Sequence, residues 1–182
     1  MNTMKLSENE LNIISQWKPL LNLFRDGEFK SEEDICENEL ERFVNRLRAH
    51  KWLRVEVLEK GMYGSYYSIF LSSDLKDIGE VEGVQVNLSV LVPYAVIGRT
   101  KMHFFKDARG SSLLDYDELA SPKNINCRIS KVVKNCLGST CYKLVEPYEM
   151  DAVLPVGISP MDYCTTKKPW NRLFHIIFQA TD

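Results

Sequence analysis

The sequence predicts an α+β protein: N-terminal helices packed on a mainly antiparallel sheet, with one or two further helices. Two observations carry this prediction. Apolar residues recur at helical spacing up to about residue 49, and from residue 53 they alternate with polar ones, as in a strand with one buried face. Helices followed by a run of strands are typical of α+β folds. We expect a single domain over residues 1–182, with a division into 1–75 (helices and hairpin) and 84–182 (sheet) as the alternative.

Two helices are expected before the strands. Ser7 and Glu10 have the spacing of a capping box and open a helical stretch that Pro19 interrupts. Ser31 caps a second helix, which reaches about Ala49. Acids crowd the first half of this helix and bases the second, an order that suits the helix dipole.

The strands begin with a hairpin, in which residues 53–57 and 67–71 alternate on either side of a glycine-bearing turn at 60–64. Residues 73–83 are acidic and are predicted to be a connector. From Val84 to Val92, apolar residues alternate with Gln85, Asn87 and Ser89, and Pro93 marks a bulge, a turn or an edge before a long strand through about Phe105.

The C-terminal part mixes elements. After a polar loop at 106–112, residues 125–137 are predicted to form a helix with Gly138 as its C-cap. A strand is expected at about 140–145. The closing WNRLFHIIFQ alternates imperfectly, and we expect it to form a final, largely buried strand.

Composition narrows the function classes. The net charge of −2 and pI near 6.0 give no overall attraction to nucleic acid or anionic membranes. No apolar run is long enough to cross a bilayer, and the N-terminus lacks the apolar core of a signal peptide. Five cysteines, an odd number, suit reduced thiols in the cytoplasm. The sequence therefore predicts a cytoplasmic protein.

No residue pattern predicts catalysis. The cysteines and histidines keep no zinc spacing, and no glycine-rich nucleotide loop occurs. Asp115, Asp117 and Glu118 could act as acid and base or hold a cation, but this pattern is common where carboxylates cap a helix. We expect no catalytic residue, metal or cofactor. A small enzyme that uses Cys or Asp residues stays open as a third function class.

Three polar residues, Arg99, Lys101 and His103, fall on one face of the long strand. An antiparallel sheet with one solvent-exposed face needs polar residues on that face, and the favoured interpretation is that these three residues serve only this purpose. The alternative is a surface for an anionic or charged partner.

Residues 28–72 resemble the last helix and wing of a winged helix-turn-helix domain. The resemblance is carried by ERFVNRLRAHKWLRVEV and the hairpin that closes on GSYYSIFL. It implies a nucleic-acid-binding or regulatory protein whose helix enters the major groove. The acidic first half of the helix departs from that pattern, because phosphates would repel it.

A second stretch, YYSIFLSSDLKDIGEVEGVQVNLSVLVPYAVIG, together with WNRLFHIIFQ, resembles bacterial immunity proteins of contact-dependent growth inhibition and other polymorphic-toxin systems. The resemblance implies a non-enzymatic protein that binds a cognate toxin domain and blocks it. An acidic inhibitor would be steered rapidly to a basic toxin surface. The toxin and the oligomeric state are not indicated.

The expected partner surface draws on one or the other of the two acidic runs, 32–41 or 74–82, and two hairpin aromatics could supply anchoring area. Its residues are Glu32, Glu33, Asp34, Glu37, Glu39, Glu41, Asp74, Asp77, Glu80, Glu82, Tyr63 and Tyr66.

Overall fold

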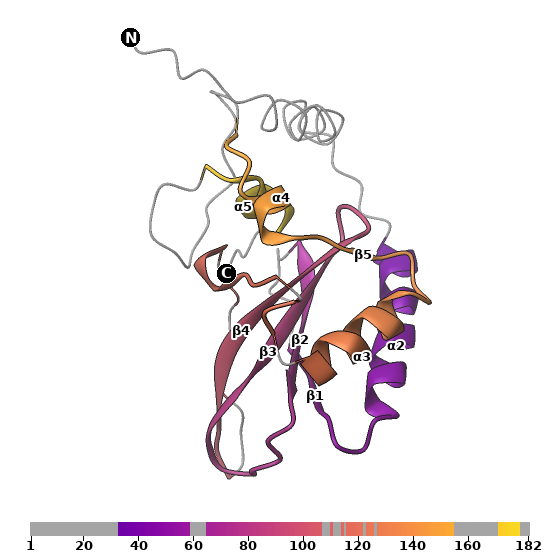
Figure 1. Ribbon diagram of the computed structural model, residues 1–182. Helices are drawn as coiled ribbons and strands as arrows, with labels where there is room; N and C mark the ends of the chain where they lie inside the picture. The colour runs from indigo at the N-terminus through magenta and orange to yellow at the C-terminus, as the bar shows by residue number, and fades with distance from the viewer. Residues whose placement is uncertain are drawn as a thin grey trace.

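Figure 1 shows the computed structural model of the chain, which describes residues 33–58, 65–106, 110, 114, 116–121, 123–125, 127–154 and 171–178. The side chains of residues 33–36 and 127 lie outside the described part, and so do the expected helical stretch around Pro19 and the turn at 60–64. The described residues confirm the α+β class, because a five-stranded sheet carries helices on both of its faces.

The sheet is antiparallel except at one edge. Its strands, in spatial order, are β1 (Arg54–Leu58), β2 (Tyr66–Ser72), β3 (Gly79–Ser89), β4 (Tyr94–Phe104) and β5 (Lys143–Leu144). Only the pairing of β4 with β5 is parallel. The helices are α2 (Glu33–Arg48), α3 (Cys127–Leu137), α4 (Pro147–Met150) and α5 (Leu173–Ile177), with a 3-10 turn η1 at Tyr116–Glu118.

Helices α2 and α3 cover one face of the sheet, on the right in Figure 1. The apolar stripe of α2 supplies Phe43 and Leu47, both fully buried, and α3 supplies Val133. These side chains pack on residues such as Val86 and Ile97, which point to this face from β3 and β4. The predicted packing of the second helix on the sheet is therefore confirmed.

The opposite face is covered near its upper end by the buried helix α5. The rings of Tyr66 and Phe178 meet edge to face at 6.0 Å. The hydroxyls of Ser65 and Ser89 donate to the carbonyl of Ile177 at 3.0 and 3.2 Å. This short helix is therefore fixed to the sheet by both apolar packing and hydrogen bonds.

A polar network lies buried on the same face, at the middle of the sheet. Asn87 Oδ1 accepts from Ser68 Oγ at 2.9 Å and from Gln85 Nε2 at 3.1 Å, and both Gln85 and Asn87 are fully buried. The polar half of the alternation in β3 therefore faces the protein interior, not water. Mutual hydrogen bonds make such burial tolerable.

Two sequence-based predictions are corrected here. Residues 73–83 are not wholly a connector, because β3 begins at Gly79 and Val81 is buried. The closing segment forms helix α5, not a strand, and residues 173–178 are all buried. Periodicity cannot separate helix from strand when every side of an element is buried.

The other boundaries agree more closely with expectation. The hairpin of β1 and β2 is present, with Val57 opposite Ile69, and Pro93 lies in the turn between β3 and β4. The strand expected at 140–145 is reduced to β5, which has two residues. Helix α3 ends at Leu137, and the amide of Gly138 donates to the Lys134 carbonyl, as expected for a residue that follows a helix.

Candidate functional site

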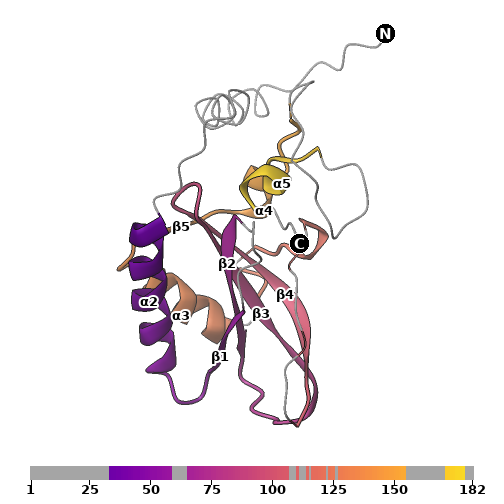
Figure 2. The ribbon, with the colours of Figure 1, turned by 180° about the vertical axis from the view of Figure 1, so that it is seen from behind.

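The candidate site is the lower end of the sheet in Figures 1 and 2, which we call the distal end. It comprises residues 73–83, which are the β2–β3 turn and the start of β3, and residues 99–106, which are the second half of β4 and the two residues after it. In both views these strand ends extend beyond the start of α3 and lie far from α4 and α5.

Acidic and basic side chains form two adjacent columns on one face of the distal end. In the strand register Glu82 is opposite Lys101, and Glu80 is opposite His103. Lys101 Nζ lies 2.8 Å from Glu80 Oε1 and 3.6 Å from Glu82 Oε1. Arg99 continues the basic column and donates to the Asn124 carbonyl. The predicted acidic run and the basic residues of β4 thus share one surface.

The ion pair between Lys101 and Glu80 shifts the pKa values of both side chains. The hydrogen bond from Lys101, followed by its positive charge, holds the pKa of Glu80 below its ordinary value. The same hydrogen bond and the charge of Glu80 raise the pKa of Lys101. Both groups are charged at neutral pH, and the two columns largely neutralise each other.

The β2–β3 turn is held by a dense set of hydrogen bonds. Arg54 donates to the carbonyls of Lys76 at 2.7 Å and Leu75 at 3.1 Å, while its guanidinium lies 4.3 Å from the centre of the Phe104 ring. Gly79 has φ +102°, a conformation that a side chain would disfavour. The turn is therefore organised before any partner arrives.

A second layer of contacts fixes the same turn. Ser72 Oγ donates to the Glu82 carbonyl at 2.7 Å and accepts from the Asp74 amide at 3.0 Å. Asp74 Oδ1 accepts from the Lys76 amide, also at 3.0 Å, and this hydrogen bond is the main reason that the pKa of Asp74 is lowered.

Large apolar side chains stand exposed around this rigid turn. Leu75, Ile78 and Phe105 are 52%, 61% and 54% exposed. Ile78 lies just before β3 and Phe105 just after β4, whose last pair is Gly79 opposite Phe104. The Phe105 ring lies 4.6 Å from that of His103. Neighbouring exposed apolar residues with a polar rim are typical of a protein–protein contact surface.

The structure does not bring all the predicted partner residues together. Asp74, Asp77, Glu80 and Glu82 lie at the distal end. Glu37 and Glu41 are exposed on the first nine residues of α2, and the start of this helix lies away from the distal end in Figure 1. The two acidic runs are therefore separate surfaces.

The remaining predicted residues are less accessible or not described. Glu39 is half-buried, bound to Arg42 at 2.8 Å and to the Cys141 amide at 3.0 Å. Tyr66 is 8% exposed and belongs to the core, because β2 is covered on both faces, so it offers no surface anchor. Glu32, Tyr63 and the side chains of Glu33 and Asp34 lie outside the described part.

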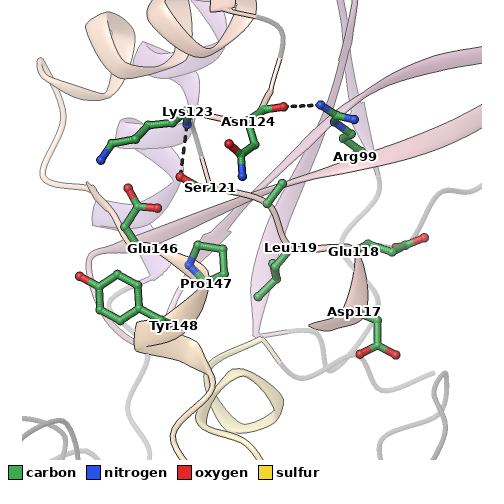
Figure 3. Close-up of a pocket in the computed structure, with 11 residues that line it drawn as sticks. Arg99, Asp117, Glu118, Leu119, Ser121, Lys123, Asn124, Glu146, Pro147 and Tyr148 are labelled. Atoms are coloured by element: carbon green, nitrogen blue, oxygen red, sulfur yellow. Dashed lines mark hydrogen bonds between the residues drawn. The ribbon is translucent and has the colours of Figure 1, made fainter. Parts of the chain in front are cut away.

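A second concave feature lies beside β4 and is drawn in Figure 3. It is an open groove of about 900 Å³ between β4, η1 and the starts of α3 and α4. Arg99 and Lys123 line one side, and Glu118 and Glu146 lie across from them (Figure 3). Gly98 permits the close approach of η1, because a Cβ there would lie 2.5 Å from the Glu118 carbonyl oxygen.

A cluster of polar side chains joins η1 to the C-terminal helix. The Tyr116 hydroxyl donates to Asp151, which also pairs with Arg172 at 3.0 Å. Burial, followed by the Asp151 contact, raises the pKa of Tyr116 to about 12. His175 Nδ1 accepts from the Arg172 amide at 3.1 Å, and burial lowers the pKa of His175. These contacts tie α5 to the rest of the fold.

Two further observations bear on chemistry. Among the described residues, no three His, Cys, Asp or Glu side chains come together as a possible metal site. Cys136 is buried and Cys141 is exposed. Burial raises the pKa of Cys136, which disfavours the nucleophilic thiolate. That all five cysteines are reduced stays a prediction.

Sequence inspection missed the apolar part of the candidate site. It selected the acids around the β2–β3 turn but not Leu75, Ile78 or Phe105. A usable signal was present, since Leu75 and Ile78 are large apolar residues within a segment expected to be a connector. The hydrogen bonds from Arg54 to the β2–β3 turn could not be predicted from the sequence, because they join residues about twenty positions apart and depend on the fold.

No protein-family model, curated protein or solved structure matches this chain. Among the described helices, none is both long and apolar enough to cross a membrane.

Proposed function

We propose that this chain is a cytoplasmic immunity protein, which binds a cognate toxin domain and neutralises it without catalysis of its own. The observation that carries the proposal is the distal end, where a rigid turn exposes large apolar side chains inside a charged rim. Binding to a surface that is already ordered loses little conformational entropy. A few buried anchors supply most of the energy of such contacts.

The electrostatic part of the proposal differs from the sequence-based expectation. Acidic steering to a basic toxin would require acids that are not already neutralised. Glu80 and Glu82 share ion pairs with Lys101 and lie beside the column that also holds Arg99, whereas Asp77 has an ion pair of 3.5 Å with Arg54 and a side chain that is 96% exposed. The contact that we propose is therefore centred on Leu75 and Asp77, with apolar burial as its main driving force.

The test is co-expression with the toxin domain encoded beside this chain, with growth as the readout. Wild-type protein should restore growth. Leu75→Arg should abolish protection while the melting temperature stays unchanged, and Lys131→Glu, an exposed residue on α3, should protect fully. If both variants protect fully, the distal end is not the binding site. If the wild-type protein gives no protection, the proposed function is wrong.

The second candidate is a winged-helix nucleic-acid-binding or regulatory protein. One observation favours it, since Arg42, Arg46 and Arg48 are exposed on the second half of α2. Against it, the hairpin is part of a five-stranded sheet and β2 is entirely buried. We expect no tight binding of duplex DNA at physiological salt. Salt-sensitive nanomolar binding in an anisotropy assay would place this candidate first.

A further inference from the structure

We propose that a cationic strip along the seam between α2 and α3 binds single-stranded nucleic acid. Helices α2 and α3 lie side by side in one layer on the sheet (Figures 1 and 2). The strip consists of four exposed bases, two from each helix: Arg42, Arg46, Arg128 and Lys131. The inference does not depend on the proposed function, because the contact proposed for a toxin domain lies at the distal end.

Two contacts show how the helices are aligned along the seam. At one end, Arg42 Nη1 of α2 donates to the Ser139 carbonyl, just after α3, at 3.5 Å. At the other end, the guanidinium of Arg128 at the start of α3 lies 3.7 Å from the centre of the ring of Trp52, which follows α2. The helices therefore run antiparallel, and the strip has the length of α3, about 16 Å.

Positive charge is concentrated on this layer, although the whole chain has a net charge of −2. Helix α3 contains Arg128, Lys131 and Lys134 and no acid. On α2, Glu39 pairs with Arg42 at 2.8 Å, but the side chain of Arg42 stays 57% exposed. A surface of this kind attracts a polyanion, because binding releases the counterions that surround the anionic chain.

The strip lacks the large apolar side chains that other anionic partners would require. In the described part of the chain, the exposed residues of that kind are Leu75, Ile78, Phe105 and Tyr148, and none of them belongs to α2 or α3. Protein contacts draw most of their energy from such anchors, and helices that bind membranes insert them. Phosphates require only charge and hydrogen-bond donors, and the guanidinium of arginine donates to them in pairs.

One end of the strip also offers a stacking surface, which favours a single strand. The exposed side chain of Arg128 rests on the half-buried ring of Trp52. An unpaired base can stack on a guanidinium plane or on an aromatic ring. The bases of a duplex are stacked on one another and cannot reach such a surface. RNA and single-stranded DNA share the chemistry that the strip would recognise.

Fluorescence anisotropy with purified full-length protein and a fluorescein-labelled oligouridylate tests the inference. Wild type should bind with a dissociation constant of about 10⁻⁴–10⁻⁶ M at physiological salt, which is typical of non-specific binding. The logarithm of the association constant should fall with the logarithm of the salt concentration with a slope of about −2 to −3, as expected for three or four phosphate contacts. Oligothymidylate in parallel distinguishes DNA from RNA. No binding of either strand, even at low salt, would overturn the inference.

A matched pair of variants tests the location. Arg42→Gln/Lys131→Gln should weaken binding by about tenfold or more at low salt and should reduce the steepness of the salt dependence by about 1.4, because two phosphate contacts are lost. Lys101→Gln/Lys106→Gln removes the same charge from the distal end and should bind like wild type. Both variants should keep the melting temperature of wild type. An unchanged affinity in the first variant, or an equal loss in the second, would contradict the strip.

The stacking contact has its own test. Arg128→Lys keeps the charge but removes the guanidinium plane. It should weaken binding of the oligonucleotide by about threefold or more with an unchanged salt dependence, and it should weaken binding of an abasic strand less. Equal losses on the two strands would contradict stacking at Arg128.

Other anions complete the experiment. Tighter binding of polyglutamate, of anionic lipid vesicles or of a duplex than of the single strand would assign the strip to a different partner and overturn the inference. In the co-expression assay, Arg42→Gln/Lys131→Gln should still protect fully. Failure of nucleic-acid binding therefore leaves the proposed function standing, and loss of toxin protection leaves the strip standing.

Discussion

The two halves of the β3–β4 pair share the same alternating pattern but have opposite surroundings. In the half next to the helices, Val86 and Ile97 are buried under α2 and α3. In the distal half, Glu82 and Lys101 occupy the equivalent alternate positions on the same face, and no described helix lies over them. Strand periodicity places a residue on a face, and tertiary packing decides whether that face becomes core or contact surface.

The difference between the halves implies different consequences of mutation. Substitutions near the helices should act on stability, and substitutions at the distal end should act on association while the fold persists.

The largest effect is expected at the helix-covered core. Phe43→Ala should lower the free energy of unfolding by about 3–5 kcal/mol, because it leaves a cavity where the ring is fully buried. Phe105→Ala at the distal end should change it by about 0.5 kcal/mol or less. Urea denaturation of the two variants at a concentration where the protein is monomeric makes the comparison. Similar losses in both would break the division between the two halves.

A smaller effect is expected at the boundary between the halves. Gly98→Ala should destabilise by about 1–3 kcal/mol, because the new methyl would lie 2.5 Å from the Glu118 carbonyl oxygen and would push η1 away from β4. Gly138→Ala is the matched control, since its nearest contact would be an ordinary 3.5 Å. Thermal unfolding of both variants distinguishes a close approach of backbones from a general intolerance of alanine.

The pH dependence should arise near α5 more than at the exposed distal end. Burial lowers the pKa of His175 below its ordinary value of 6.5, so the folded state favours the neutral imidazole. Above pH 6.5 both states are neutral there. As pH falls below 6.5 the unfolded state takes up the proton first, and stability decreases by at most about 1.4 kcal/mol per pH unit.

The matched variant for this prediction is His175→Asn, which retains an acceptor for the Arg172 amide but does not titrate. Its free energy of unfolding should decrease less than that of wild type between pH 7 and pH 5. Arg172, Asp117 and Tyr116 face the imidazole and remain in both proteins. Parallel pH profiles would show that His175 does not control this range.

The fold class, the hairpin and the long strand were predictable because each depends on local periodicity that the sequence displays directly. The closing helix was not, because LFHII is buried on every side and has no polar face to reveal its period. The start of β3 was also missed. Glu80 and Glu82 suggested a solvated connector, whereas they are the exposed half of a strand whose other half holds Val81.

For the candidate site, the sequence indicated charge but not its balance. Alternation placed Arg99, Lys101 and His103 on one face of the strand, and their exposure confirms that placement. That Lys101 pairs with both Glu80 and Glu82 depends on the register between two strands, which composition cannot give. The hydrogen bond from Arg54 to the Leu75 carbonyl likewise joins residues that are distant in the sequence. The sequence allowed two interpretations of these basic residues, a solvent-exposed sheet face or a partner surface. Both interpretations concern side chains that the fold places beside Glu80 and Glu82.

We propose that the contact with a toxin domain lies at the distal end and not on the acidic half of α2. The most direct test measures the affinity of an immobilised cognate toxin domain for dilute protein by surface plasmon resonance. Leu75→Ser should weaken binding at least thirtyfold, a loss of about 2 kcal/mol that is typical of a central anchor. Glu37→Lys/Glu41→Lys should bind within about threefold of wild type. Loss of binding in the α2 variant, with Leu75→Ser unaffected, would contradict the account.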